Sequence, residues 1–173
     1  GAAAGAVASG RVPASGDGDP WTSWLTPASL LGGVLAVAVC AWTSAQGVGL
    51  GIDLECIEPR SPAFVSDYFT AAEQALIAGA ARERDAVLVW STKEAMLKAL
   101  GRGLRLDTRA VEVLRIADHE ESDGWRGLTV RCPSRPELDW WAGWTPAGEF
   151  LITLAVCGQA LNFSALHVQE LRV

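Results

Sequence analysis

Residues 90–101 read WSTKEAMLKALG, and the arrangement of the rest of the chain depends on this stretch. Ala, Met, Leu, Lys and Glu are strong helix formers, and Gly101 stands where a helix commonly stops. The sequence therefore predicts a helix from about residue 86 to residue 100. Trp90, Glu94 and Lys98 are spaced four residues apart, so we expect them to share one face of this helix.

The chain has two lysines, Lys93 and Lys98, and both lie in this helix, while all its other cationic side chains except the two histidines are arginines. Lysine offers a compact ammonium group on a flexible stem, which differs from the planar fork of arginine. This choice indicates a site that needs a point charge. The alternative is an exposed Glu–Lys helix pair, which contributes only a few tenths of a kcal/mol.

A second chemical pattern lies in residues 48–57, which read VGLGIDLECI and are typical of a strand. Side chains alternate along a strand, so Asp53 and Glu55 point to the same face. Two neighbouring carboxylates repel each other unless a cation lies between them, and oxygen ligands favour a hard ion such as Mg²⁺. A solvated strand face is the alternative interpretation.

Length and composition limit the class of protein. The chain has 173 residues, half of them apolar and eight of them Trp, which is enough for one domain or two small halves sharing a core. A net charge of −6 argues against a general nucleic-acid binder. The longest apolar run, residues 30–42, is shorter than the roughly 20 residues that cross a bilayer. We therefore expect a buried strand there and no membrane contact.

The cysteines are scattered and do not form a zinc-binding pattern; they are Cys40, Cys56, Cys132 and Cys157. Scattered thiols are typical of a reducing compartment, and we expect a cytoplasmic protein.

The remaining segments predict a mixed α and β domain. Residues 1–19 are rich in Gly, Ala, Ser and Pro and read as a flexible linker, and because the chain does not begin with Met we expect a piece of a longer polypeptide. Residues 20–173 form the domain. Thr70 and Glu73 have capping-box spacing and open a helix that we expect to run to about Arg82, followed by a charged break at residues 82–85. The other expected elements are a hairpin of strands at 33–42 and 48–57, a short helix at 63–69, strands at 111–116, 127–132, 140–144 and 150–157, and a last strand or short helix at 165–173.

Two of these stretches together resemble the signature of the 4′-phosphopantetheinyl transferases, and more closely the larger, surfactin-synthetase-activating type. The family pattern G-x-D-x-E is matched by GIDLE at 51–55, and W-[SC]-x-K-E-[SA]-x-x-K by WSTKEAMLK at 90–98. Between them, YFTAAE at 68–73 matches an aromatic-Phe-x-x-x-E element, and GRGL at 101–104 matches a Gly-rich turn. The resemblance covers roughly residues 30–173.

The resemblance implies an α+β fold with a pseudo-twofold pair of small, mostly antiparallel sheets packed by helices, and an active cleft between the halves. Residues 20–57 would be the remnant of a shortened N-terminal half, and residues 58–173 the C-terminal half. The chain would be a stand-alone activator or a domain of a larger synthase.

The resemblance also implies a reaction, in which the 4′-phosphopantetheine arm of coenzyme A moves to a serine of an acyl or peptidyl carrier protein. Such proteins serve polyketide, nonribosomal peptide or fatty acid synthesis. By similarity, Asp53, Glu55 and Glu94 would hold Mg²⁺, Lys93 would contact a coenzyme A phosphate, and Lys98 would lie close to the transferring phosphoryl group. Glu94, Glu55 or a metal-bound water would take the serine proton, and these alternatives stay open.

The chain departs from the family pattern at its N-terminal side. Family members carry Ser-His-Ser just before the strand aligned with residues 33–42, and that His contacts coenzyme A phosphate; here residues 27–30 read PASL. The two histidines, His119 and His167, lie elsewhere. Three explanations stay open: the first half is shortened, part of it lies outside this sequence, or another subunit completes the pocket, as in the smaller trimeric class.

The partner expected from the resemblance is an acidic carrier protein. Arg102, Arg105 and Arg109 follow the central helix and could form its docking face. Alternatively, they complement the negative end of the helix dipole. Two other functions stay open: a non-catalytic relative with a structural or carrier-docking role, and a different Mg²⁺-dependent phosphate-handling enzyme, for which the chain offers no P-loop.

Overall fold

The computed structural model describes residues 39–41, 43, 45–117, 119, 120 and 124–159. Several expectations fall outside these ranges: the linker at 1–19, most of the strand at 33–42, the last element at 165–173, and His167. In the described part of the chain, no helix is long and apolar enough to cross a membrane.

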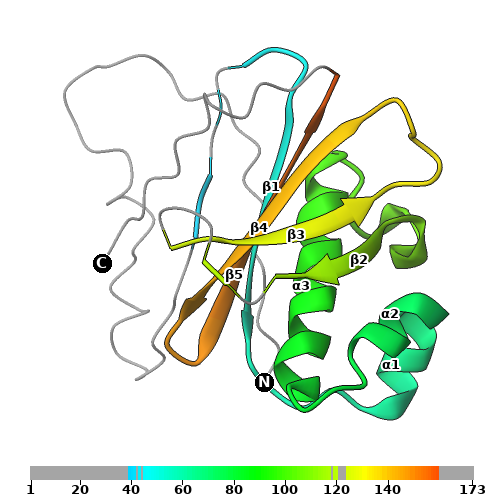
Figure 1. The fold of residues 1–173 in the computed structure, drawn as a ribbon. Coiled ribbons are helices and arrows are strands. Elements are labelled where there is room, and N and C mark those ends of the chain that lie inside the picture. The colour runs from blue at the N-terminus through cyan, green and yellow to red at the C-terminus, as the bar shows by residue number, and fades with distance from the viewer. Residues whose placement is uncertain (1–38, 42, 44, 118, 121–123, 160–173) are drawn as a thin grey trace, which may run out of the picture. The chain divides into compact units, whose positions relative to one another are not determined.

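The described residues form one antiparallel sheet of five strands in the order β1-β5-β4-β3-β2 (Figure 1). The strands are β1 (Gly49–Cys56), β2 (Glu112–Ile116), β3 (Arg126–Arg131), β4 (Asp139–Ala147) and β5 (Phe150–Gly158). Four of them match the strands expected after the central helix, and β1 matches the strand expected at residues 48–57. The α+β fold class is confirmed.

The position of β1 bears on the expected division into halves without deciding it. We expected residues 20–57 to belong to a first half with its own sheet, but β1 pairs antiparallel with β5 along its whole length. Its eight residues therefore extend the same sheet as the strands that follow the central helix. The division at residue 57 stays a prediction, because most of the expected first half lies outside the described ranges.

In the described ranges, three helices precede β2, and the longest of them, α3 (Arg82–Ala99), packs against β1 and β5 (Figure 1). The two shorter helices are α1 (Pro62–Tyr68) and α2 (Ala71–Leu76). Two short 3-10 turns follow α3, at Gly103–Arg105 and Thr108–Ala110.

The boundaries of α2 and α3 correct two expectations. The helix opened by Thr70 ends at Leu76 and does not reach Arg82. The charged residues 82–85 are not a break, because they form the first turn of α3. Glu83 and Asp85 lie in that turn, where negative side chains stabilise the positive end of the helix dipole.

The predicted start of α2 and end of α3 are confirmed. The Thr70 hydroxyl accepts from the Glu73 backbone N–H at 3.3 Å, and Glu73 Oε2 accepts from the Thr70 N–H at 2.8 Å, which completes the capping box. After α3, Gly101 has a φ of 66°, a left-handed conformation that glycine adopts without strain. The Arg102 N–H then donates to the Leu97 carbonyl, which closes the helix.

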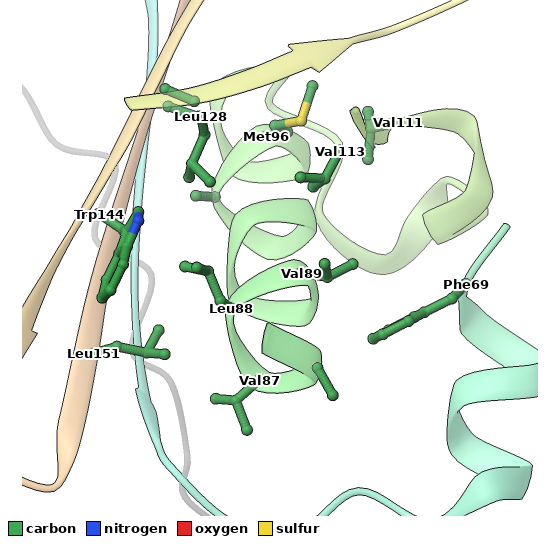
Figure 2. Close-up of a cluster of buried hydrophobic side chains, with 14 of the residues drawn as sticks. Phe69, Val87, Leu88, Val89, Met96, Val111, Val113, Leu128, Trp144 and Leu151 are labelled. Carbon is green, nitrogen blue, oxygen red and sulfur yellow. The ribbon is translucent and has the colours of Figure 1, made fainter. Parts of the chain in front are cut away.

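The core lies on both sides of α3. Buried side chains therefore point in most directions around this helix. Figure 2 shows Leu88 on the side of Trp144 and Leu151 from the sheet, and Val89 on the side of Phe69. Because α3 is covered on two sides, only a narrow strip of its surface is accessible to a ligand.

Candidate functional site

The strip of α3 that is not buried carries the residues predicted from their spacing. Between residues 86 and 99, every position is buried except Trp90, Glu94 and Lys98. Since α3 packs against β1, this strip lies beside the strand that carries Asp53.

Asp53 is held from two sides by α3. Its Oδ1 accepts from Lys98 Nζ at 2.6 Å, and its Oδ2 accepts from the Ser91 hydroxyl at 2.6 Å. Lys98 Nζ also donates to the Ile52 carbonyl at 3.1 Å. An ammonium group has three hydrogens, so one remains for a ligand, and the Lys98 side chain is 18% exposed.

Glu55, two residues further along β1, is bound by different partners. Arg60 forms an ion pair with its Oε2 at 2.7 Å, and the Trp90 indole N–H donates to its Oε1 at 3.1 Å. Burial raises the pKa of Glu55 above its ordinary value and the Asp53 carboxylate raises it further, whereas Arg60 and Trp90 oppose the shift. Arg60 also lies over the ring of Phe64, with its guanidinium carbon 5.5 Å from the ring centre.

Glu94 lacks such partners among the described residues. Its Oε1 is buried and accepts no hydrogen bond from any of them. Burial raises the pKa of Glu94 above its ordinary value, and the charges of Asp53 and then Glu55 raise it further, while Lys98 lowers it. A buried carboxylate oxygen without a donor, beside two other carboxylates, fits a cation.

The carboxylates do not form a closed metal site in this structure. In the described ranges, no group of three or more His, Cys, Asp and Glu side chains lies close enough to hold a metal ion. Asp53 and Glu55 are instead engaged by Lys98 and Arg60. Glu94 is the best candidate ligand, because its Oε1 accepts no hydrogen bond from a described residue, whereas both oxygens of Asp53 and of Glu55 accept one each.

Lys93 lies outside this strip of α3, in the core. Its side chain and that of Glu73 are both 0% exposed. Its Nζ donates to Glu73 Oε1 and Oε2 at 2.8 and 2.7 Å and to the Val111 carbonyl at 2.8 Å, which uses all three hydrogens. Glu73 also accepts from the Thr70 and Val113 N–H groups. This placement does not support the expected contact between Lys93 and coenzyme A, because the ammonium group has neither exposure nor a free donor.

A basic hollow lies past the end of α3. We call it the arginine hollow, and its volume is about 250 Å³. Its lining residues are Leu100, Arg102, Arg105, Leu106, Cys132, Ser134 and Arg135. Arg109, which we expected beside Arg102 and Arg105, is not among them and pairs with Asp107 at 3.2 Å.

Comparison with known families identifies the chain. The model of the 4′-phosphopantetheinyl transferase superfamily matches residues 49–154, a range that contains Asp53, Glu55, Glu94 and Lys98. The chain belongs to this superfamily. The larger type expected from the sequence stays a prediction. No curated protein sequence matches the chain.

A solved structure shares the fold of this superfamily member, and a second one has a lower similarity. A holo-(acyl-carrier-protein) synthase from Bacillus anthracis in complex with CoA (3′,5′-ADP) is similar with a TM-score of 0.50 and 22% identity, covering 65% of this chain and 96% of that chain. The ACPS–CoA complex from Chronobacterium ammoniagenes has a TM-score of 0.48 and 14% identity, covering 67% of this chain and 100% of that chain.

Several residues of the candidate site were not predicted from the sequence. Ser91 lies inside the family motif, but the motif alone does not indicate its hydrogen bond to Asp53. Arg60 follows a proline outside the motif, and only its position five residues after Glu55 could have indicated the ion pair. Thr153 and Arg135 carry no local signal, because they come close to the site or the hollow only through the sheet and the β3–β4 loop.

Proposed function

We propose that this phosphopantetheinyl transferase moves the 4′-phosphopantetheine arm from coenzyme A to a serine of a carrier protein. The observation that carries the proposal is Glu94 Oε1, a buried carboxylate oxygen without a donor among the described residues. Glu94 lies in the family-matched region and on the same strip of α3 as Lys98, which pairs with Asp53. This combination supports the proposal, because a carboxylate with an oxygen that lacks a donor and a partly free ammonium group share one strip of α3.

Asp53 and Glu94 would hold Mg²⁺, with Glu55 as a further ligand once its bond to Arg60 is released. Mg²⁺, when bound, supplies charge neutralisation for the diphosphate of coenzyme A and for the oxygen that leaves. The hydrogen bond from Lys98 to Asp53 Oδ1 would persist while it does so.

Lys98 would bind a phosphate oxygen of coenzyme A with its remaining hydrogen. Two of its hydrogens are given to Asp53 and the Ile52 carbonyl, which fix the direction of the third. A positive group at this point stabilises the negative charge of the transferring phosphoryl group.

The serine hydroxyl of the carrier attacks the phosphorus that bears the pantetheine arm, and the bond from that phosphorus to adenosine 3′,5′-bisphosphate breaks. The proton of the serine must go to a base. Glu94 is better suited than Glu55, since its Oε1 has no donor among the described residues and can accept the proton. Both oxygens of Glu55 already accept hydrogen bonds. A water molecule would be the alternative base.

The arginine hollow is the proposed docking point for an acidic carrier. Neither Arg102 nor Arg105 forms an ion pair with any described residue, and Arg135 adds a third guanidinium that is shared with Glu137. Guanidinium groups match carboxylates in planar geometry, so the hollow fits an acidic side chain of the partner. One of its lining residues, Leu100, follows Lys98 by two positions in the sequence. The proposed docking point is therefore close in sequence to the lysine that would bind the phosphate.

The test is incubation with coenzyme A, Mg²⁺ and an apo carrier protein, followed by measurement of the carrier's intact mass. We expect the carrier to gain the mass of the phosphopantetheine arm, and we expect a chelator to prevent the gain. A transferase known to load the same carrier serves as the positive control. No gain beside a working control would instead support a non-catalytic relative that keeps the fold and the docking surface.

The pathway and the location of the protein belong to the same proposal. Service to polyketide, nonribosomal peptide or fatty acid synthesis follows from the larger type suggested by the sequence motifs. All four cysteines are free, which agrees with a reducing, cytoplasmic compartment.

A further inference from the structure

Two buried hydroxyl groups lie behind Asp53, and the proposed reaction does not use either of them. Ser91 on α3 and Thr153 on β5 are both 0% exposed. Their oxygens are 2.8 Å apart, and the Ser91 oxygen is 2.6 Å from Asp53 Oδ2. Thr153 also lies directly opposite Asp53 in the pairing of β1 with β5.

The direction of these hydrogen bonds follows from counting hydrogens. A carboxylate only accepts, so the single hydrogen of Ser91 goes to Asp53. The Ser91 oxygen is then left as an acceptor, and the hydrogen between the two hydroxyls must come from Thr153. The chain of donors therefore runs from Thr153 to Ser91 to Asp53.

This chain of donors can form because α3 lies unusually close to β1. A Cβ atom at Gly51 would be 2.0 Å from the Ala95 carbonyl oxygen, and one at Gly49 would be 2.2 Å from the Ala99 carbonyl oxygen. Both glycines thus allow the backbones of helix and strand to meet. Ser91, with its short side chain, then reaches Asp53 and Thr153 together.

We infer that Ser91 and Thr153 are positioning residues for Asp53, acting in series through the Ser91 hydroxyl. The inference rests on the proposed function, because it assigns to them the orientation of a carboxylate that holds Mg²⁺. With Oδ2 bound to Ser91 and Oδ1 bound to Lys98, the carboxylate cannot rotate, and its remaining lone pairs have fixed directions. Partners of this kind around a metal ligand typically change metal affinity by about 10–100-fold.

The experiment is calorimetric titration of Mg²⁺ into the protein in the presence of coenzyme A. The variants are Ser91→Ala, Thr153→Val, Thr153→Ser and the double variant with Ser91→Ala and Thr153→Val. We expect Ser91→Ala to weaken Mg²⁺ binding about tenfold or more. Thr153→Val should weaken it less, because Ser91 keeps its bond to Asp53, and Thr153→Ser should bind as the parent does.

The double variant tests whether the two residues act in series. Once Ser91 is alanine, Thr153 has no route to Asp53, so the double variant should bind Mg²⁺ no more weakly than Ser91→Ala alone. Additive losses would overturn the serial arrangement, because they would mean that Thr153 acts independently of Ser91.

Thr92→Val is the matched control. Thr92 is the next residue on α3, is equally buried, and donates its hydroxyl hydrogen to the Leu88 carbonyl. We expect Thr92→Val to leave Mg²⁺ affinity unchanged, even if it lowers the melting temperature. Equal loss of affinity in Thr92→Val and Ser91→Ala would show a general effect of buried hydroxyl removal and overturn the inference.

The outcomes separate this inference from the proposed function. If the parent binds Mg²⁺ and loads carrier but Ser91→Ala binds Mg²⁺ equally well, the inference fails and the proposed function stands. If the parent binds no Mg²⁺ in the presence of coenzyme A, the metal-dependent function fails and the inference fails with it.

Discussion

At the scale of single residues, the three acidic side chains of the site differ in how their charge is balanced. Asp53 is paired with Lys98, and Glu55 with Arg60, while Glu94 Oε1 has no donor among the described residues. A buried charge without a partner is costly, so Glu94 is where a bound cation would stabilise the protein most.

Glu94→Gln is the most direct test at this scale. An amide keeps the volume and loses the charge, so we expect carrier loading to fall by about 100-fold or more. The melting temperature of the metal-free protein should stay the same or rise, because a buried charge has been removed. Glu83→Gln, an exposed position in the first turn of the same helix, is the control and should load carrier normally. If Glu94→Gln loaded carrier at nearly the parental rate, Glu94 would have no role in the reaction.

The raised pKa of Glu94 also predicts a pH dependence of stability. When the folded-state pKa of an acid is raised, the folded protein binds more protons than the unfolded chain at pH values above the ordinary pKa, here 4.5. The contribution of Glu94 to the free energy of unfolding should therefore fall as pH rises from 4.5 through the folded-state pKa. Urea unfolding of metal-free parent and Glu94→Gln across this range should show the parent losing stability relative to the variant. A constant difference between the two proteins would contradict the assigned cause.

At the scale of elements, the site depends on how α3 is held. On one side, Gly49 and Gly51 of β1 allow close backbone contact with α3. On the other side, the buried Lys93–Glu73 pair connects α3 with α2 and with the start of β2. The two contacts lie on opposite sides of the helix, so they set its distance from the sheet and its rotation.

Gly51→Ala should disturb the first of these contacts. The added Cβ would lie 2.0 Å from the Ala95 carbonyl oxygen, a backbone atom that cannot move without the helix. Overpacking typically costs about 1–3 kcal/mol and occasionally more, and we expect the upper end or beyond, with loss of carrier loading. Gly79→Ala is the control, since a Cβ there meets no atom within 4 Å. Unfolding with denaturant measures the stability of both variants. Equal stability of Gly51→Ala and Gly79→Ala would contradict the close contact between β1 and α3.

Lys93→Met should disturb the second contact. It leaves Glu73 as an unpaired buried charge, and breaking such pairs typically costs about 3–5 kcal/mol. Adding Glu73→Gln should recover part of this loss, because the charge is removed while one oxygen still accepts from a backbone N–H. The Michaelis constant of the double variant for coenzyme A should match that of the parent. If Lys93→Met were stable and its Michaelis constant for coenzyme A were raised, Lys93 would bind coenzyme A as the sequence resemblance implied.

At the scale of the whole molecule, charge decides how a carrier can approach. The chain has a net charge of −6, so its overall field repels an acidic partner. The arginine hollow is a local exception, because three arginines are among the residues that line it. Productive docking should therefore depend on a small part of the surface and on ionic strength.

Arg102→Glu combined with Arg105→Glu tests this dependence. We expect the Michaelis constant for carrier to rise at least tenfold, while the constant for coenzyme A stays nearly unchanged. Loading by the parent should slow as salt is added, because screening weakens the attraction. Arg109→Glu is the control, as Arg109 lies outside the hollow and already pairs with Asp107. If the double variant loads carrier normally, or if Arg109→Glu is equally damaging, the carrier docks elsewhere.

Local patterns in the sequence were sufficient for most elements and for part of the site. The helix around residue 90, its end at Gly101, the capping box at Thr70 and the strip of Trp90, Glu94 and Lys98 all follow from spacing and propensity. These features depend on residues a few positions apart, and short-range geometry is the same in almost any fold.

Only the tertiary structure decided which charged groups are available. Lys93 and Lys98 stand five residues apart on the same helix, and nothing local says which of them faces the core, because α3 is covered on two sides. Thr153 reaches Ser91 across 62 positions of sequence, through a strand register that also brings it opposite Asp53. Long-range pairing of this kind depends on the packing of the whole sheet against α3, and therefore the partners of each carboxylate could not be predicted from the sequence.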